Sequence, residues 1–276
     1  MRCQLCPRRC RLAEGQTGHC RARKASGGVT VPLNYGRLTS LALDPIEKKP
    51  LYHFHPGSYI LSVGSFGCNL RCPFCQNHEI SMAGDGELRT RDLDPGALTA
   101  LALRLKAEPS GNLGVAFTYN EPLISFEYVR DCAALLREAG LEVVLVTNGQ
   151  INPAPLEELL PLVSALNIDL KGFTQRVYDY VGGSLKAARH SIERCLESTH
   201  VEVTTLIVPG LNDDPAVMRE EAAWLSSLSP ELPLHLSRFF PRYQLSDQPP
   251  TPRATLLELC QVARTSLRHV YPGNLH

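Results

Sequence analysis

The order of apolar runs and helical stretches constrains the fold of this chain more than any other feature. From residue 59 onward, apolar runs of about six residues alternate with longer segments of helical periodicity. The runs expected to be strands are 59–66, 113–118, 141–147, 165–170, 201–208 and 234–239. The expected helices are 95–107, 123–139, 153–162, 186–197, 213–228 and 252–268. Six strand–helix units in a row imply parallel strands joined by right-handed crossovers.

The number of these units also indicates the type of domain. A chain of 276 residues is long enough for one large barrel-like domain. We therefore predict an α/β fold with a partial (β/α)6 barrel over residues 51–276, preceded by an N-terminal cysteine-rich segment over residues 1–50. A flat, doubly wound sheet is the alternative arrangement of the same units. One further strand is expected near residues 29–33.

Composition narrows the classes of function. Lys and Arg together number 28, as do Asp and Glu, so a net charge of zero gives no overall attraction to nucleic acid or an anionic membrane. The N-terminus lacks the apolar core of a signal peptide, and no run approaches the ~18 apolar residues of a membrane span. We expect a cytoplasmic globular protein. Ten cysteines, most of them clustered, indicate metal binding rather than disulfides.

Three of these cysteines, Cys68, Cys72 and Cys75, directly follow the first predicted strand at the spacing Cys-x3-Cys-x2-Cys. Thiolates are the usual ligands of iron–sulfur clusters, and three of them leave one iron of a 4Fe-4S cluster open. An open metal position is typical of a catalytic site. We expect that iron to bind S-adenosylmethionine (SAM), so that an electron from the cluster releases a 5′-deoxyadenosyl radical.

A zinc loop or a run of buried thiols is the alternative interpretation of this spacing, because short cysteine spacings are common in zinc sites. Two details favour the cluster. An aromatic residue, Phe74, stands directly before the last cysteine, and no second Cys-x2-Cys pair follows within ~20 residues, as a zinc ribbon would require.

A second cysteine group lies at the N-terminus, where Cys-x2-Cys-x3-Cys is followed by a fourth cysteine ten positions on. Its members are Cys3, Cys6, Cys10 and Cys20. Four thiolates with turn glycines between them can close a tetrahedral zinc site or hold a second cluster, and the sequence leaves both open. The segment has too few apolar residues to fold by burial, so a bound metal would stabilise it. Four reduced surface thiols are the alternative, and the basic side chains here are expected to form a solvated face.

Polar side chains follow the ends of the later predicted strands. Parallel barrels place their chemistry at the C-terminal ends of their strands, so these side chains are expected to meet at one rim with the cysteine loop. The alternatives are that Glu121 only caps a helix and that Asp169 and Lys171 form a surface ion pair of little energetic value. The rim residues are Thr118, Tyr119, Asn120, Glu121, Asn148, Asp169, Lys171 and His235.

The remaining cysteines and two histidines receive structural interpretations. Cys132, Cys195 and Cys260 fall at helical spacing with apolar neighbours and are expected in the core. His53 and His55 would share one face of an extended segment, but they lack a third ligand nearby, so we expect hydrogen-bonded surface groups.

Beyond the cysteine loop, the chain resembles the radical SAM superfamily. The resemblance is to the branch that contains the pyruvate formate-lyase activating enzymes, and more closely to the radical SAM component of the AmmeMemoRadiSam system. It extends over nearly the whole chain. The stretches that carry it are residues 3–10, 44–53, 68–77, 79–81, 118–122, 169–171 and 235–239.

The resemblance implies roles for the rim residues. Phe74 would border the adenine of SAM, and residues 118–121 stand where activating enzymes carry a Gly-Gly-Glu type of turn that holds the methionyl amino group. Tyr119 and Asn120 replace those glycines here. Asp169 and Lys171 match an Asp-x-Lys pair that helps to bind a monovalent cation and the SAM carboxylate or ribose. His235 matches a histidine near the ribose, and Asn148 joins the set as a rim residue.

The expected function is that of a radical SAM oxidoreductase, which cleaves SAM at a 4Fe-4S cluster and abstracts a hydrogen atom from a substrate. Its partners would be SAM, an electron donor such as flavodoxin or ferredoxin, and a substrate that is a small molecule or a side chain of another protein. One alternative is an activating protein that acts on a glycyl-radical partner enzyme. Another is a metal-binding or electron-transfer module without SAM chemistry.

Overall fold

The computed structural model describes residues 1–275 and is organised around an eight-stranded sheet. The strand order is β12-β11-β10-β9-β8-β7-β5-β4, and all neighbours are parallel except β4 and β5. The strands are β4 (Ser40–Pro45), β5 (Tyr59–Gly64), β7 (Gly114–Phe117), β8 (Glu142–Thr147), β9 (Ala165–Asp169), β10 (His200–Ile207), β11 (Leu234–Arg238) and β12 (Val270–Gly273).

Helices connect these strands, and two short antiparallel pairs lie outside the large sheet. The pairs are β1 (Arg23–Ser26) with β2 (Val29–Pro32), and β3 (Arg37–Leu38) with β6 (Arg91–Asp92). The helices are α1 (His78–Ser81), α2 (Pro95–Lys106), α3 (Phe126–Glu138), α4 (Pro153–Leu159), α5 (Gln175–Val181), α6 (Leu185–Leu196), α7 (Pro215–Leu228) and α8 (Arg253–Ala263). Short 3-10 turns are η1 (Ile46–Lys48), η2 (Pro122–Ser125), η3 (Leu160–Leu162) and η4 (Tyr243–Leu245). Among the described residues, no helix is both long and apolar enough to cross a bilayer.

All six strands and six helices predicted from the sequence are present, as is the strand near residues 29–33. Several elements were not predicted, among them the short β1, β3, β6 and α1, and three that belong to the sheet or its connections. β4 is an antiparallel edge strand that falls within the segment expected to precede the barrel, and β12 is a four-residue parallel edge strand that contains Pro272. α5 is a seven-residue helix, too short to show a helical period.

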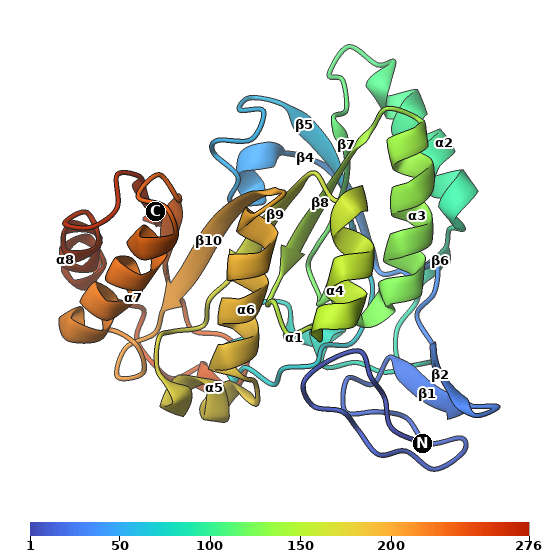
Figure 1. Cartoon of the computed structure of the whole chain (residues 1–276), viewed down its shortest axis with the longest axis horizontal. Coiled ribbons are helices and arrows are strands. Elements are labelled where there is room, and N and C mark those ends of the chain that lie inside the picture. Colours follow the sequence, from blue (N-terminus) through green and yellow to red (C-terminus); the bar gives the residue numbers. More distant parts are fainter. Residues whose placement is uncertain (276) are drawn as a thin grey trace.

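The arrangement of the helices decides between a partial barrel and a doubly wound sheet. Helices cover one face only (Figure 1), where one large core contains alternate strand residues such as Leu61, Val115 and Val143. The opposite face carries a second core with Ala116 and Val144. Because a doubly wound sheet needs helices on both faces, the fold is an open, partial barrel.

The inner face is closed near the strand N-termini by the segment of residues 46–54. Ile46 and Leu51 are fully buried against Ile60 of β5 and the inner residues of β7, β8 and β9. The segment is also fastened to β10, because the amides of Tyr52 and His53 donate to the carboxylate of Glu202 at 3.0 and 2.7 Å. It therefore acts as a floor to the barrel interior.

The N-terminal cysteine-rich segment packs at the other end of the barrel, next to the loop before α4 (Figure 1). The amide of Asn152 donates to Leu5 O at 2.9 Å, and its side chain donates to the carbonyl oxygens of Gln4 and Cys6. Arg8 donates to Gly182 O at 2.5 Å. These contacts join the segment to the ends of β8 and α5.

Candidate functional site

The cysteine loop begins four residues after β5 ends. Cys68 Sγ accepts the amide of Leu70 at 3.3 Å and the side-chain nitrogen of Asn148 at 3.6 Å. Cys72 and Phe74 are buried, whereas Cys75 is half-buried. Burial raises the pKa of Cys72 to about 12 and also raises that of Cys68, so both are neutral thiols until a metal displaces their protons.

Glu121 follows β7 and is hydrogen-bonded to residues at the C-terminal end of β8, beside the cysteine loop. One carboxylate oxygen accepts the hydroxyl of Thr147 at 2.7 Å and the amide of Leu123 at 2.9 Å, and the other accepts the amide of Asn148 at 2.8 Å. Glu121 is 3% exposed, and burial raises its pKa to about 7. It caps η2, as one sequence interpretation expected, and it also fixes the turn that carries Asn148.

Tyr119 and Asn120 support the chain on either side of the cysteine loop. Asn120 accepts the amide of Ser65 and donates to the carbonyl oxygens of Phe66 and Gly67, the residues that lead into Cys68. Tyr119 has φ +70°, a left-handed conformation that is costly for a bulky residue and natural for glycine. No feature of the sequence predicts that this backbone geometry persists without a glycine.

Tyr119 is also held by its side chain and its carbonyl. Its hydroxyl donates to Asp44 at 2.8 Å, and its carbonyl oxygen accepts Asn77 at 2.7 Å. Thr118, directly before it, is buried, and its amide donates to Val63 O. The turn that follows β7 is thereby fixed to both the cysteine loop and β4.

Asp169 and Lys171 form a close pair at the end of β9. Lys171 Nζ lies 2.8 Å from Asp169 Oδ2, and the lysine side chain is 15% exposed. Burial opposes the lysine charge, but Asp169 and the nearby thiols of Cys72 and Cys75 raise the pKa of Lys171. Because the lysine lies within electrostatic reach of two loop cysteines, the pair belongs to the site rather than to the open surface.

His235 lies at the second residue of β11, not at the C-terminal end of that strand. Its Nε2 is 2.7 Å from Glu202 Oε2, and both side chains are buried. The strand register nevertheless puts Asp169, Thr204 and His235 in one row across the sheet, because the strands are staggered. His235 therefore lines the barrel interior in the same row as Asp169, the last residue of β9.

Glu202 is a residue that the sequence interpretation missed. It is fully buried and accepts four hydrogen bonds: from His200, from His235, and from the amides of Tyr52 and His53. Burial alone would raise its pKa, but these hydrogen bonds outweigh it and lower the pKa to about 2. The signal was a single carboxylate within the apolar run 201–208.

The comparisons with known proteins agree with this geometry. A family model described as the radical SAM superfamily matches residues 62–221, more than half of the chain. The chain belongs to the radical SAM superfamily. Uncharacterized protein MJ0808 of Methanocaldococcus jannaschii is 38% identical and is aligned over 100% of this chain and 81% of its own length.

Two further matches connect the chain to one branch of the radical SAM superfamily. The pyruvate formate-lyase-activating enzyme of Clostridium pasteurianum is 31% identical over 56% of this chain, and the alignment spans only 65% of that enzyme. A crystallised domain of a pyruvate-formate lyase-activating enzyme from Bacteroides vulgatus superimposes with a TM-score of 0.50 at 20% identity, over 58% of this chain and 99% of that one. The chain is therefore related to these activating enzymes.

Membership in the radical SAM superfamily implies a 4Fe-4S cluster and SAM, and the side chains fit them. Cys68, Cys72 and Cys75 lie on one short loop, and each thiolate that holds such a cluster binds a different iron. Lys171 supplies a positive charge beside the cysteines, and Asn148 supplies a hydrogen-bond donor to Cys68.

The four N-terminal cysteines line one small cavity next to the cysteine loop, whose Asn69 also lines it. Burial raises the pKa of Cys6 to about 11 and also raises that of Cys20. The amide of Arg8 opposes this shift at Cys6, as the amide of Ala22 does at Cys20, because each donates to the sulfur. None of the ten cysteines forms a disulfide.

The structural interpretations of the three other cysteines and of His53 are confirmed. Cys132, Cys195 and Cys260 are fully buried in the large core. His53 Nε2 lies 2.7 Å from the hydroxyl of Tyr271, and His55 is exposed.

Gly67, directly before Cys68, packs closely against the N-terminal segment. Its φ is +86°, and a Cβ placed there would lie 2.5 Å from Cys20 O and 2.9 Å from Ala22 Cβ. Replacing Gly67 with alanine is expected to cost at least roughly 2 kcal/mol, since the left-handed conformation alone costs about 1–2 kcal/mol. Urea unfolding monitored by circular dichroism would measure the loss.

Gly86→Ala is the matched control for Gly67→Ala. Gly86 has φ +80°, but a Cβ there would meet nothing within 4 Å. Gly86→Ala should therefore lose only the part of the unfolding free energy that the left-handed backbone costs. Equal losses in the two variants would contradict the tight packing of Cys20 against the loop.

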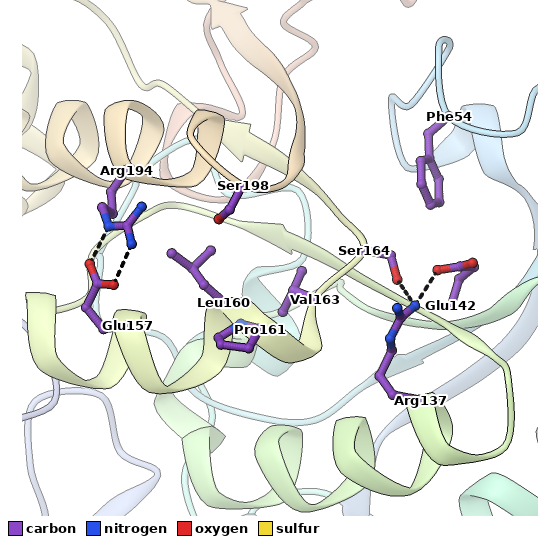
Figure 2. A pocket seen from close by; sticks show the side chains of 10 residues that line it. All are labelled: Phe54, Arg137, Glu142, Glu157, Leu160, Pro161, Val163, Ser164, Arg194 and Ser198. Carbon is purple, nitrogen blue, oxygen red and sulfur yellow. Dashed lines mark hydrogen bonds and ion pairs between the residues drawn. The ribbon is translucent and has the colours of Figure 1, made fainter.

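A separate cavity lies away from this site, at the N-terminal ends of β8, β9 and β10 (Figure 2). It measures about 610 Å³. Its charged side chains are engaged with each other, Arg137 with Glu142 at 2.8 Å and Arg194 with Glu157 at 2.5 Å. In parallel barrels this end contributes to stability rather than to chemistry.

Proposed function

We propose that this chain reductively cleaves SAM at a 4Fe-4S cluster bound by Cys68, Cys72 and Cys75, and then abstracts a hydrogen atom from a substrate. One electron from the reduced cluster breaks a carbon–sulfur bond of the sulfonium, giving methionine and a 5′-deoxyadenosyl radical. That radical takes a hydrogen atom from the substrate and becomes 5′-deoxyadenosine. The observation that carries the proposal is a three-thiol loop after β5, with the charge of Lys171 within electrostatic reach of two of its cysteines and Asn148 donating to Cys68.

The other rim residues hold SAM in this proposal. The carboxylate of Asp169 is one-third exposed and uses one oxygen on Lys171, so this pair is suited to the polar groups of SAM. Phe74 borders the adenine. The turn of residues 118–121 positions the methionyl end through its backbone, because the carboxylate oxygens of Glu121 already accept three hydrogen bonds. His235 faces the ribose from the barrel wall.

A second candidate is an activating protein that takes its hydrogen atom from a glycine of a partner enzyme. The similarity to pyruvate formate-lyase-activating enzymes favours it. The resemblance to the AmmeMemoRadiSam component favours a different substrate. In either case the electron would come from a donor such as flavodoxin or ferredoxin, and we place the reaction in the cytoplasm.

An anaerobic cleavage assay tests the proposal. The protein is reconstituted with iron and sulfide, reduced with dithionite and incubated with SAM, and 5′-deoxyadenosine is quantified by chromatography. Its formation supports radical SAM chemistry. A brown protein that forms none would indicate electron transfer alone, and a colourless protein that carries only zinc would contradict the cluster.

Asn148 is expected to tune the cluster without binding it. Asn148→Ala removes the donor to Cys68 Sγ and to Asn69 Oδ1. The rate of SAM cleavage should fall about 10-fold to 100-fold, as for other outer-shell partners of a metal site. Loss of a hydrogen bond to the thiolate should also lower the reduction potential of the cluster, which a redox titration followed by electron paramagnetic resonance (EPR) would measure.

Asn274→Ala serves as the control for Asn148→Ala. Asn274 is an exposed asparagine after β12, with one long contact to Arg238 O at 3.4 Å. An Asn148 variant with the rate and potential of this control would show that the contact with Cys68 has no influence on the cluster.

A further inference from the structure

The turn after β7 carries a tyrosine in a backbone conformation that bulky residues avoid. Tyr119 has φ +70°, in the left-handed region that favours glycine. We propose that Asp44 and Lys49, acting through the side chain of Tyr119, hold this turn in the conformation that binds the methionyl end of SAM. Both are then positioning residues. The inference rests on the function proposed above, in which the backbone of residues 118–121 holds SAM.

Asp44 is the anchor of the tyrosine side chain. It lies in β4 directly opposite Ile60 of β5, whose side chain packs in the inner core, so Asp44 faces the inside of the barrel. The hydroxyl of Tyr119 donates to Asp44 Oδ2 at 2.8 Å. Because β5 lies between β7 and β4 in the sheet, this bond ties the turn to a strand that is not its neighbour. A hydrogen bond to a carboxylate is about twice as strong as one between neutral groups.

Lys49 holds both the carboxylate and the ring. Its Nζ lies 2.9 Å from Asp44 Oδ2, and the lysine side chain is buried. The same nitrogen lies 4.8 Å from the centre of the Tyr119 ring, where the face of the ring attracts a cation. Lys49 therefore contacts the tyrosine directly and also orients the acceptor of its hydroxyl.

The neighbouring strand leaves space for the tyrosine ring. Gly64 is the last residue of β5, and a Cβ placed there would lie 2.8 Å from Tyr119 Cδ2 and 3.0 Å from Tyr119 Cβ. Gly64 is not left-handed, so its lack of a side chain matters here rather than its backbone freedom. The carbonyl oxygen of Tyr119 also accepts the side chain of Asn77 at 2.7 Å. These contacts together offset the cost of the left-handed conformation.

Two substitutions of Tyr119 separate the backbone cost from the side-chain contacts. Tyr119→Ala and Tyr119→Gly remove the same ring and hydroxyl, but only glycine adopts the left-handed conformation without steric cost. Tyr119→Ala should therefore bind SAM about 5-fold to 30-fold more weakly than Tyr119→Gly, the factor that corresponds to this cost. Equilibrium dialysis of the reconstituted full chain against labelled SAM, without reductant, measures Kd in the absence of turnover. Equal Kd values for the two folded variants would overturn the inference.

Tyr119→Phe tests the contact with Asp44 alone, because the ring and its contact with Lys49 remain. The Kd for SAM should rise about 10-fold, as expected for the loss of one hydrogen bond to a charged group. Tyr35→Phe is the matched control, since the hydroxyl of Tyr35 donates to Asp131 of α3 at 2.7 Å, outside the barrel interior. This control should keep the wild-type Kd. A wild-type Kd in Tyr119→Phe would overturn the role of Asp44.

The dialysis experiment separates this inference from the proposed cleavage of SAM. Binding with the expected differences among the variants supports the positioning role even if no 5′-deoxyadenosine is formed, in which case only the cleavage proposal fails. Where cleavage occurs, Tyr119→Phe should raise KM with kcat unchanged, because the contact it removes acts on binding. A lower kcat at unchanged KM would overturn the inference. A wild type that binds no SAM would overturn both proposals.

Discussion

Replacing Cys72 with alanine is expected to reduce 5′-deoxyadenosine formation to the level of a control without protein. Cys72 is buried near Lys171 and is one of the three thiols proposed to hold the 4Fe-4S cluster. Without Cys72 the cluster would keep only two thiolate ligands. Water and carboxylate are harder ligands than thiolate and do not replace it in an iron–sulfur cluster. The measurement is chromatography of 5′-deoxyadenosine after anaerobic incubation with SAM and dithionite, together with iron analysis.

The iron analysis distinguishes loss of the cluster from loss of the fold. Alanine at Cys72 should lower the iron content by about four per chain while the circular dichroism spectrum stays that of the wild type. The control is Cys260→Ala, since Cys260 is fully buried on α8 within the helix-covered core. Wild-type amounts of product from the Cys72 variant would show that the loop is not where SAM is cleaved.

Glu202→Ala is expected to destabilise the barrel more than other single changes on its inner face. The substitution leaves four donors without their acceptor, two of which are the amides that hold the floor segment to β10. Each buried donor left unsatisfied costs about 1–3 kcal/mol, so a loss of roughly 4 kcal/mol or more follows. Urea unfolding at pH 7 would measure it.

The same carboxylate makes stability depend on pH in a defined direction. The pKa of Glu202 is about 2 in the folded chain against an ordinary value of 4.5, so the unfolded chain binds the proton more readily. Its contribution, on the order of 3 kcal/mol, is present above pH 4.5 and is lost as the pH falls from 4.5 toward 2. Glu202→Gln should flatten the acid limb of the plot of unfolding free energy against pH.

Glu221 provides a control in which the dependence of stability on pH has the opposite sign. It is buried on α7 with a single hydrogen bond, from Thr205 at 2.6 Å, and burial raises its pKa to about 7. Its ionisation therefore lowers stability as the pH rises from 4.5 through 7, and Glu221→Gln should remove that loss. A Glu202→Gln variant with the acid limb of the wild type would contradict the account of Glu202.

The success of the fold prediction has a simple physical basis. The central strands are buried on both faces and so appear as continuous apolar runs, which is how β7, β8 and β9 were recognised. β4 and β12 lie at the two edges of the sheet, where one side of the strand has no partner and the apolar pattern weakens. The positions of Asp169 and Lys171 at the rim followed from where β9 ends.

The features that escaped prediction depend on contacts between distant parts of the chain. Glu202 acquires its role only when the floor segment, 149 positions earlier at His53, meets β10. The sequence places His235 on the sixth predicted strand, but its depth in the barrel depends on how β11 is staggered against β10, which the sequence does not reveal. The left-handed backbone of Tyr119 could not be inferred, since glycine, its usual sign, is absent.

The attachment of the N-terminal segment has a consequence for the order of events during synthesis. The N-terminal segment is synthesised long before the residues that hold it. Leu5 is bound by Asn152 and Arg8 binds Gly182, so the segment cannot dock until both partners have been made. Until about two thirds of the chain has been made, the thiols of this segment lack these contacts and stay open to oxidation. The shielding of this segment is therefore a late step in folding, because it follows formation of the barrel rim.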